Sequence, residues 1–321
     1  MAKKWLLVLL LSVLAMNHSI LVSLSKRTGR YDYFSETLVF LSELIKLGIS
    51  SYFVYHQAAA SSLAGESAGS AHHRGVAELR RAFSFKSLPA LAPSVLYAVQ
   101  NNLQYVALLY LTAPSYQVLS NLKVIATGLV FRMFMGKQLN ELQWSALLLV
   151  AVGSATTQIP ACAFDAATGL PAEISFNGMG VFLICIISML SGLAAIASEI
   201  LVKNPDESMH FTNIQLYKFG VVINFCILLW RRFDATTGFF GLFVGLDGLA
   251  FVVLLNNSFM GLIVSVVLKY ADSVLKVYST SVAMLLTTVV SIYLFDFQAS
   301  IQLWLGIIVV SVALYLHGLK H

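Results

Sequence analysis

The chain has 321 residues, of which 58% are hydrophobic and only 11% are charged, and its net charge is +5 at pH 7. A typical soluble domain has about 25% charged residues, so this composition excludes a chain whose whole surface faces water. The basic excess does not indicate nucleic-acid binding. The lysines and arginines are scattered among hydrophobic runs, as in membrane proteins with a positively charged cytosolic side.

Hydrophobic runs predict an all-α polytopic membrane protein with about ten transmembrane helices, since a span needs about 20 residues. No polar stretch is long enough for a separate soluble domain, so we expect a single transmembrane domain over residues 1–321. The predicted helices cover residues 5–24, 33–56, 88–111, 113–135, 139–159, 174–202, 210–230, 241–268, 273–295 and 301–319.

The first run, residues 5–24, follows Lys3 and Lys4 and has two interpretations. It could be a cleaved signal peptide, whose apolar core is about 7–15 residues long. Because this run is longer, a retained first span is favoured.

Two polar connections interrupt the runs. Ala58–Phe85 is rich in Ala, Ser and Gly, which predicts a flexible surface loop with His72 and His73 in water rather than on a metal. Asp165–Glu173 lies near the middle of the chain and separates five predicted helices from five. Two halves of odd helix number have opposite orientations in the membrane, so the count predicts two inverted five-helix repeats.

The distribution of basic residues predicts the orientation. The side that holds both termini carries ten lysines and arginines in its loops, against five on the other side. By the positive-inside rule, both termini are expected in the cytosol. Five further lysines fall within or at the edge of predicted spans and need a separate explanation: Lys46, Lys123, Lys218, Lys269 and Lys276.

Lys123 lies close to the middle of the predicted span 113–135. A charge at the bilayer centre costs roughly 2.5–3.5 kcal/mol, so it usually faces a cavity or a partner. Tyr116, Ser120 and Lys123 follow one another at helical spacing and share a face. That face would offer a ring, a hydroxyl and a cation to a ligand.

A cluster in the predicted span 88–111 contains Tyr97, Gln100 and Asn101 on one face, with Asn102 directly after them. Amides within a span need hydrogen-bond partners. Each amide alone could serve as a contact between helices, but the whole cluster favours a ligand cavity.

The second half of the chain supplies similar residues. Asn213 and Tyr217 lie one turn apart near the start of the span 210–230, and Ser258, Gly261 and Lys269 lie along the span 241–268 or at its end. Lys269 could instead extend to the membrane interface.

Two acid–lysine pairs also occur at helical spacing, Glu43 with Lys46 and Glu199 with Lys203. For both, a structural ion pair is at least as well supported as contact with a ligand.

The side chains singled out suit an anionic, aromatic metabolite, because lysines bind phosphate, tyrosines stack on rings and amides can read the edge of a base. The sequence has no HExxH, P-loop, GxSxG or paired-cysteine motif. A transporter is therefore favoured over a membrane-embedded enzyme and over a channel or structural protein. We expect no cofactor, no metal and no nucleic-acid partner.

Several stretches resemble the nucleotide-sugar transporters of the Golgi, in particular the group of CMP-sialic acid and UDP-galactose transporters. The resemblance covers nearly all of the chain from Tyr33 to Gly318. The matching stretches are Pro93–Asn102, Tyr116–Val118, Leu122–Lys123, Leu142–Trp144, Asn213–Tyr217 and Val266–Asp272.

This resemblance implies a ten-helix drug/metabolite-transporter fold in the Golgi membrane. It also implies an antiporter that exchanges a cytosolic nucleotide sugar for lumenal nucleoside monophosphate, with a homodimer left open. The positions that match the family's nucleotide pocket are Tyr97, Gln100, Asn101, Asn102, Tyr116, Lys123, Asn213, Tyr217, Ser258 and Lys269.

Within the group, the Asn213–Tyr217 stretch is more similar to CMP-sialic acid transporters, so the expected substrate is CMP-sialic acid or a related CMP-sugar. A UDP-sugar/UMP antiporter of the UDP-galactose kind is the alternative. Two departures bear on the sugar rather than on the nucleotide: Ser120 and Asn121 replace a Tyr-Gln pair of the family, and Lys276–Ser279 replaces its Lys-Gly-Phe-Ser/Ala.

Overall fold

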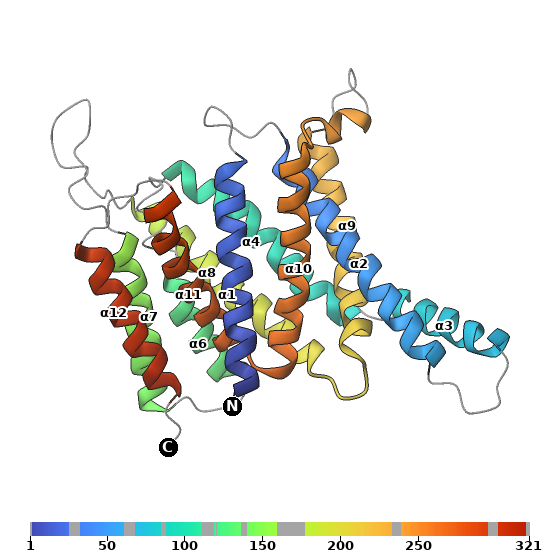
Figure 1. Ribbon diagram of the computed structural model, residues 1–321, viewed down its shortest axis with the longest axis horizontal. Coiled ribbons are helices and arrows are strands. Elements are labelled where there is room, and N and C mark those ends of the chain that lie inside the picture. Colours follow the sequence, from blue (N-terminus) through green and yellow to red (C-terminus); the bar gives the residue numbers. More distant parts are fainter. Residues whose placement is uncertain are drawn as a thin grey trace. The chain divides into compact units, whose positions relative to one another are not determined.

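The computed structural model describes residues 2–25, 33–60, 68–84, 88–110, 119, 121–135, 140–158, 177–232, 239–294 and 301–318. Throughout this part of the chain the only regular structure is helical, with eleven α-helices, two short 3₁₀ helices and no strand (Figure 1). The predicted all-α class is confirmed.

The first half of the chain forms α1 (Ala2–Leu24), α2 (Ser35–Ala60), α3 (Ala68–Phe83), η1 (Leu88–Ala90), α4 (Leu91–Tyr110), α6 (Leu122–Met135) and α7 (Glu141–Gln158). The second half forms α8 (Gly178–Val202), α9 (Met209–Arg232), η2 (Phe239–Phe243), α10 (Gly248–Tyr270), α11 (Ser273–Leu294) and α12 (Ile301–Gly318). The start of the predicted helix 113–135 falls outside the described residues.

Five of the described helices are long and apolar enough to cross a membrane. A bent pair, Ser70–Phe83 with Leu88–Gln100, would add a sixth if its two parts form one span. Such helices suit lipid because each satisfies its backbone hydrogen bonds internally. A polytopic protein is therefore shown, whereas ten spans remains a prediction. The five candidate segments are Trp5–Val22, Glu36–Ala60, Gly178–Val202, Met209–Arg231 and Gly248–Tyr270.

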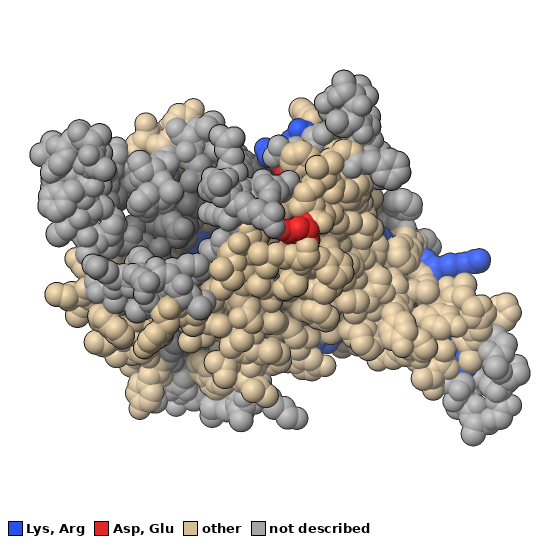
Figure 2. Space-filling view, turned by 45° about the horizontal axis from the view of Figure 1, so that its top comes forward, with Lys and Arg blue, Asp and Glu red and all other residues tan. Residues whose placement is uncertain are grey.

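The surface of the structure agrees with the low content of charged residues in the sequence. In Figure 2, most described residues on the visible face carry no charge, and lysines, arginines and acids occupy small areas. Large apolar side chains are exposed on the candidate spans, among them Leu6 on α1, Phe182 on α8 and Phe251 on α10. Exposed apolar side chains of this kind are expected where a helix faces lipid.

The chain forms two compact units. The first comprises residues 1–95 and 197–272, and the second comprises residues 96–196 and 273–321. In the first unit, α2 packs against α3, α9 and α10, and α1 packs against α10. Amide hydrogen bonds join these helices, since Asn256 donates to the Leu14 carbonyl (3.1 Å) and Asn257 to Ser42 Oγ (3.2 Å).

The second unit has its own apolar core, in which Phe131, Leu147, Tyr278 and Ala313 come from α6, α7, α11 and α12. A glycine brings α7 close to α12, because a Cβ added at Gly153 would lie 2.9 Å from a methyl carbon of Val309. Small residues allow such close approach of helices in membranes.

The prediction of a flexible loop over Ala58–Phe85 is wrong, because most of the stretch forms α3. Helix α3 is held against α2 by a 2.7 Å hydrogen bond between Tyr55 and His72. Its last turn is fixed by Lys218 of α9, whose ammonium donates to the carbonyls of Ala82 (3.1 Å) and Ser84 (2.7 Å). Carbonyls at a helix end need such partners.

The prediction of a helix from residue 241 onward is also wrong at its start. Residues up to 243 belong to η2, and Gly245 has a φ of 82°, a conformation that interrupts a helix. Asp247 then begins α10 as its N-cap, where its carboxylate accepts a 2.7 Å hydrogen bond from the Ala250 amide.

Candidate functional site

The candidate site in the first unit is a seam of polar residues between apolar helices. On each helix they recur every three or four positions and so share a face, and α2 packs against both α9 and α10. We define this polar seam as Glu43, Lys46 and Ser50 of α2, Asn213 and Tyr217 of α9, and Ser258, Gly261 and Ser265 of α10.

Tyr217 connects the three helices of the seam. Its hydroxyl is 3.1 Å from Ser265 Oγ and donates to the Gly261 carbonyl at 3.5 Å. The ammonium of Lys46 lies 4.6 Å from the centre of its ring. These contacts hold the ring in place, and a fixed aromatic ring can stack on a base or a sugar.

The Lys46 ammonium has two neighbours inside the bundle that offset the cost of its burial. Its ammonium donates to Glu43 Oε1 at 2.6 Å, and the two side chains are only 11% and 17% exposed. Removing an ammonium from water costs several kcal/mol unless a counter-charge compensates it, and the Tyr217 ring adds roughly 0.5–2 kcal/mol of attraction. The structural pairing of Glu43 with Lys46 is confirmed, and the ring contact links the pair to Tyr217.

Two glycines leave room for this ion pair. A Cβ added at Gly261 would lie 2.7 Å from Lys46 Cδ, and one added at Gly220 would lie 3.0 Å from Glu43 Oε2. Both distances are shorter than ordinary van der Waals contact. The lysine and the carboxylate therefore occupy space that larger residues on α9 and α10 would fill.

Asn213 is a buried polar side chain without a hydrogen-bond partner in the described part of the structure. It is fully buried, and neither its Oδ1 nor its Nδ2 has a hydrogen-bond partner among the described residues. The same holds for the buried hydroxyl of Ser50. Since each such group costs about 1–3 kcal/mol and most buried polar atoms in proteins are bonded, a ligand in the seam would supply the missing partners.

Two predicted residues make their contacts elsewhere. Ser258 is buried on the seam face of α10, but its hydroxyl donates to the Leu254 carbonyl within its own helix at 2.8 Å. Lys269, at the end of α10, donates to the Asn204 carbonyl at 3.1 Å. In this conformation Lys269 therefore fastens the turn between α8 and α9.

In the second unit a lysine contacts Tyr97 of α4. The Lys276 ammonium is 3.3 Å from the Tyr97 hydroxyl and 5.5 Å from the centre of its ring. Lys276 also lies close enough to act electrostatically on Lys123, near the start of α6. Gln100, one turn after Tyr97, has a buried Oε1 with no partner among the described residues. Two neighbouring ammonium groups would attract an anion such as phosphate.

Some predicted residues lack a described side chain. Asn101 and Asn102 lie within α4, but their side chains fall outside the described part of the structure, and so does the whole of Tyr116.

Four of the five lysines that composition alone left unexplained make contacts in the described part of the structure, and the fifth, Lys123, is the neighbour of Lys276. Lys46 and Lys276 each lie over a tyrosine ring, Lys218 caps α3, and Lys269 fastens a turn. Sequence reasoning did not assign Lys46, Lys276 or Ser50 to a site. The spacing of Ser50 one turn after Lys46 was a usable signal, whereas the contact of Lys276 with Tyr97 joins segments far apart in the chain.

Comparisons with known proteins agree on the family of this chain. The family model described as "Nucleotide-sugar transporter" matches residues 2–318. CMP-sialic acid transporter 1 of Oryza sativa subsp. japonica is 38% identical over 324 aligned residues, which cover 98% of this chain and 94% of that protein. CMP-sialic acid transporter 1 of Arabidopsis thaliana is 36% identical over 98% of this chain and 90% of its own length.

A more distant relative and a solved structure extend the comparison. The UDP-galactose translocator of Bos taurus is 37% identical over 73% of this chain and 58% of its own length. A solved crystal structure aligns with 99% of this chain and 96% of its own, with a TM-score of 0.67 and 11% identity. That likeness concerns the fold alone. From the family model and the full-length relatives, the chain belongs to the nucleotide-sugar transporter family.

Proposed function

We propose that the chain is an antiporter that exchanges a cytosolic CMP-sugar, CMP-sialic acid or a close relative, for lumenal CMP across the Golgi membrane. The observation that carries the proposal is the polar seam, where a fixed tyrosine ring, a buried ammonium and an unsatisfied amide lie among apolar helices. The full-length relatives named CMP-sialic acid transporters support the same substrate class.

Each part of the site suits one part of a nucleotide. The Tyr217 ring can stack on the base or the ribose. The Asn213 amide has both a donor and an acceptor free, as needed to read the edge of cytosine. Lys269 suits the phosphate once it leaves the Asn204 carbonyl. In the second unit, taken by itself, Lys123 and Lys276 also suit an anion such as phosphate.

The transport cycle is proposed to need no ion gradient, because exchange of two anions is driven by their own opposing gradients. The buried carboxylates of the first unit support this view. Glu43 is paired with Lys46 and Glu199 with Lys203, so neither resembles a carboxylate held ready for a proton or a sodium ion. We also propose that both units form one transporter domain of ten spans with both termini in the cytosol.

Exchange can be tested with purified protein in liposomes. Vesicles preloaded with CMP should take up labelled CMP faster than empty vesicles, and uptake should persist when proton and sodium gradients are dissipated. An enzyme would return a chemically altered substrate. A channel would show no acceleration from the far side, and either result would contradict the proposal.

The alternative substrate is a UDP-sugar, favoured by the similarity to the bovine UDP-galactose translocator. Cytosine carries an amine where uracil has a carbonyl, and a site built for one leaves polar groups unpaired with the other, at about 1–3 kcal/mol each. A thermal-shift panel of CMP, UMP, GMP and their sugar conjugates separates the two. Stronger stabilisation by UMP or UDP-galactose than by CMP would favour the alternative.

A further inference from the structure

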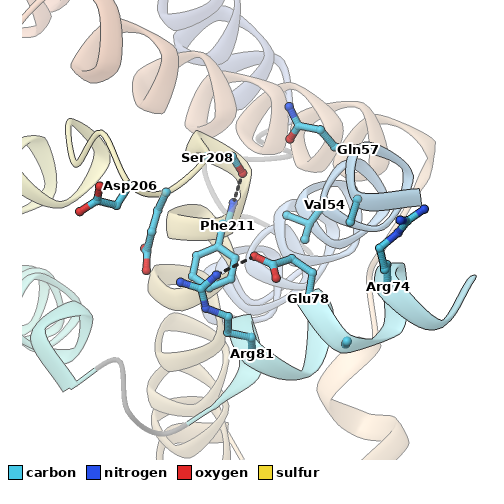
Figure 3. Close-up of a pocket in the computed structure, with 11 residues that line it drawn as sticks. Val54, Gln57, Arg74, Glu78, Arg81, Asp206, Ser208 and Phe211 are labelled. Atoms are coloured by element: carbon cyan, nitrogen blue, oxygen red, sulfur yellow. Dashed lines mark hydrogen bonds and ion pairs between the residues drawn. The ribbon is translucent and has the colours of Figure 1, made fainter. Parts of the chain in front are cut away.

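A cavity lies in the first unit outside the polar seam, where α3 meets the end of α2 and the start of α9 (Figure 3). Its volume is about 460 Å³, which is within the range of about 300–1,000 Å³ for ligand pockets. Charged side chains line it on two sides. Arg74, Glu78 and Arg81 come from α3, and Asp206 and Glu207 come from the turn between α8 and α9.

The charged groups of the cavity are partly paired, at Arg81 and Glu78, and partly apart, at Arg74 and Asp206. In Figure 3, Arg74 and Asp206 lie toward opposite sides of the view, with Phe211 and Glu78 between them. Arg81 is bonded to Glu78 at 3.2 Å and its guanidinium lies 5.1 Å from the centre of the Phe211 ring. The carboxylates of Asp206 and Glu207 form no ion pair with another residue in the described part of the chain, so a cationic group could be held there.

The cavity lies at one end of a helix that is long enough to cross a membrane, and lipid headgroups are expected at such an end. It is lined by Val54, Gln57 and Ala58, in the last two turns of a helix long enough to cross the membrane. Just before them, Tyr52 and Phe53 are 59% and 46% exposed. Exposed aromatic rings are typical of the boundary between lipid and water.

We propose that this cavity binds a zwitterionic group with one phosphate and one primary ammonium, namely the phosphoethanolamine headgroup of a membrane lipid. The phosphate lies toward Arg74 and Arg81, since guanidinium groups bind phosphate oxygens in pairs. The ammonium, with three donors, lies toward Asp206 and Glu207. The proposal depends on the chain spanning a membrane and is independent of the substrate of the polar seam.

The experiment measures binding of four probes to the delipidated, full-length protein in detergent. The probes are short-chain phosphatidylethanolamine, phosphatidylcholine and phosphatidylglycerol, and free phosphoethanolamine. Phosphatidylethanolamine should bind tightest. The double variant Asp206→Asn/Glu207→Gln and the variant Arg81→Gln should each weaken its binding about tenfold or more, as expected for loss of a charge-assisted contact.

Arg80→Gln is the matched control, because Arg80 is the exposed neighbour of Arg81 on α3 and does not line the cavity. It should leave phosphatidylethanolamine binding unchanged. Arg81 also packs on Phe211, so the variant Arg81→Gln can fail to fold. In that case the double variant Asp206→Asn/Glu207→Gln decides the test. Helix content by circular dichroism checks the fold of each variant.

Equal binding of phosphatidylethanolamine and phosphatidylglycerol would overturn the proposal, because the carboxylates would then not recognise the ammonium group. No binding of any probe would overturn it as well. Free phosphoethanolamine that binds as tightly as the lipid would support the chemistry and assign the site to a soluble ligand instead. A failure of CMP exchange would leave all of these results interpretable, since none of them involves the polar seam.

Discussion

Both units place a lysine ammonium over a tyrosine ring, but the two pairs differ in charge. In the first unit, Lys46 lies 4.6 Å from the centre of the Tyr217 ring and is bonded to Glu43. In the second, Lys276 lies 5.5 Å from the centre of the Tyr97 ring, with Lys123 as its charged neighbour. The first pair, with Glu43, is electrically neutral as a group, while the second is positive and would attract an anion.

The largest expected effect comes from removing the counter-charge of the first pair. Glu43→Gln leaves the Lys46 ammonium buried without its carboxylate, which should lower the free energy of unfolding by roughly 3–5 kcal/mol. Thermal denaturation in detergent measures it. The double variant Glu43→Gln/Lys46→Met should recover most of the loss, and a double variant as unstable as the single one would show that the pair is not the cause.

The positive charge of the second unit is tested by Lys123→Ala. Loss of one charge-assisted contact should weaken CMP binding by about one to two decades with little change in stability, because the side chain contributes little to packing. Arg132→Ala, an exposed position on the same helix, is the control and should bind CMP normally. Unchanged affinity in folded Lys123→Ala would remove this lysine from the site.

The space that the ion pair needs is tested by Gly261→Ala. The new methyl group would lie 2.7 Å from Lys46 Cδ and displace the ammonium from the Tyr217 ring, which should cost about 1–3 kcal/mol. It should also weaken nucleotide binding measured by thermal shift. Gly48→Ala on α2 has nothing within 4 Å of the new atom and should not destabilise the protein. Similar behaviour of the two variants would contradict the packing argument.

The smallest effect is expected at the edge of the first unit. Tyr55→Phe removes the hydrogen bond to His72, worth about 0.5–1.5 kcal/mol, and should loosen α3 without unfolding the spans. Hydrogen exchange of the α3 amides should accelerate, whereas Tyr52→Phe, whose ring is exposed, should leave it unchanged. Equal exchange in both variants would mean that this bond does not hold α3.

The all-helical fold was predictable because apolar runs of span length have few other structures open to them in lipid. Helix α3 was not, because its Ala, Ser and Gly content is also that of a loop. Two of the contacts that hold it come from Lys218 and Phe211, more than a hundred positions away in the chain. Sequence can show that two residues share one helix face, but not which other helix that face meets.

The same limit applies to the candidate site. The spacing of Asn213 and Tyr217 placed both on one face, and the structure brings Tyr217 together with Lys46 and Ser265. The spacing of Glu43 and Lys46 predicted their ion pair but not the ring beside it. The role of these residues in binding a nucleotide stays a prediction, and so does that of Tyr97, Gln100 and Lys123.

The cap on α3 has a mechanical consequence. Tyr217 belongs to the polar seam, and the next residue, Lys218, donates hydrogen bonds to carbonyls at the end of α3. Successive residues of an α-helix are fixed about 100° apart by its 3.6-residue turn, so α9 cannot rotate at the seam without pulling on α3. The tilt of α3 would then change when a ligand binds in the polar seam. A fluorophore on its exposed position Ala77 should change its emission when CMP binds in the polar seam.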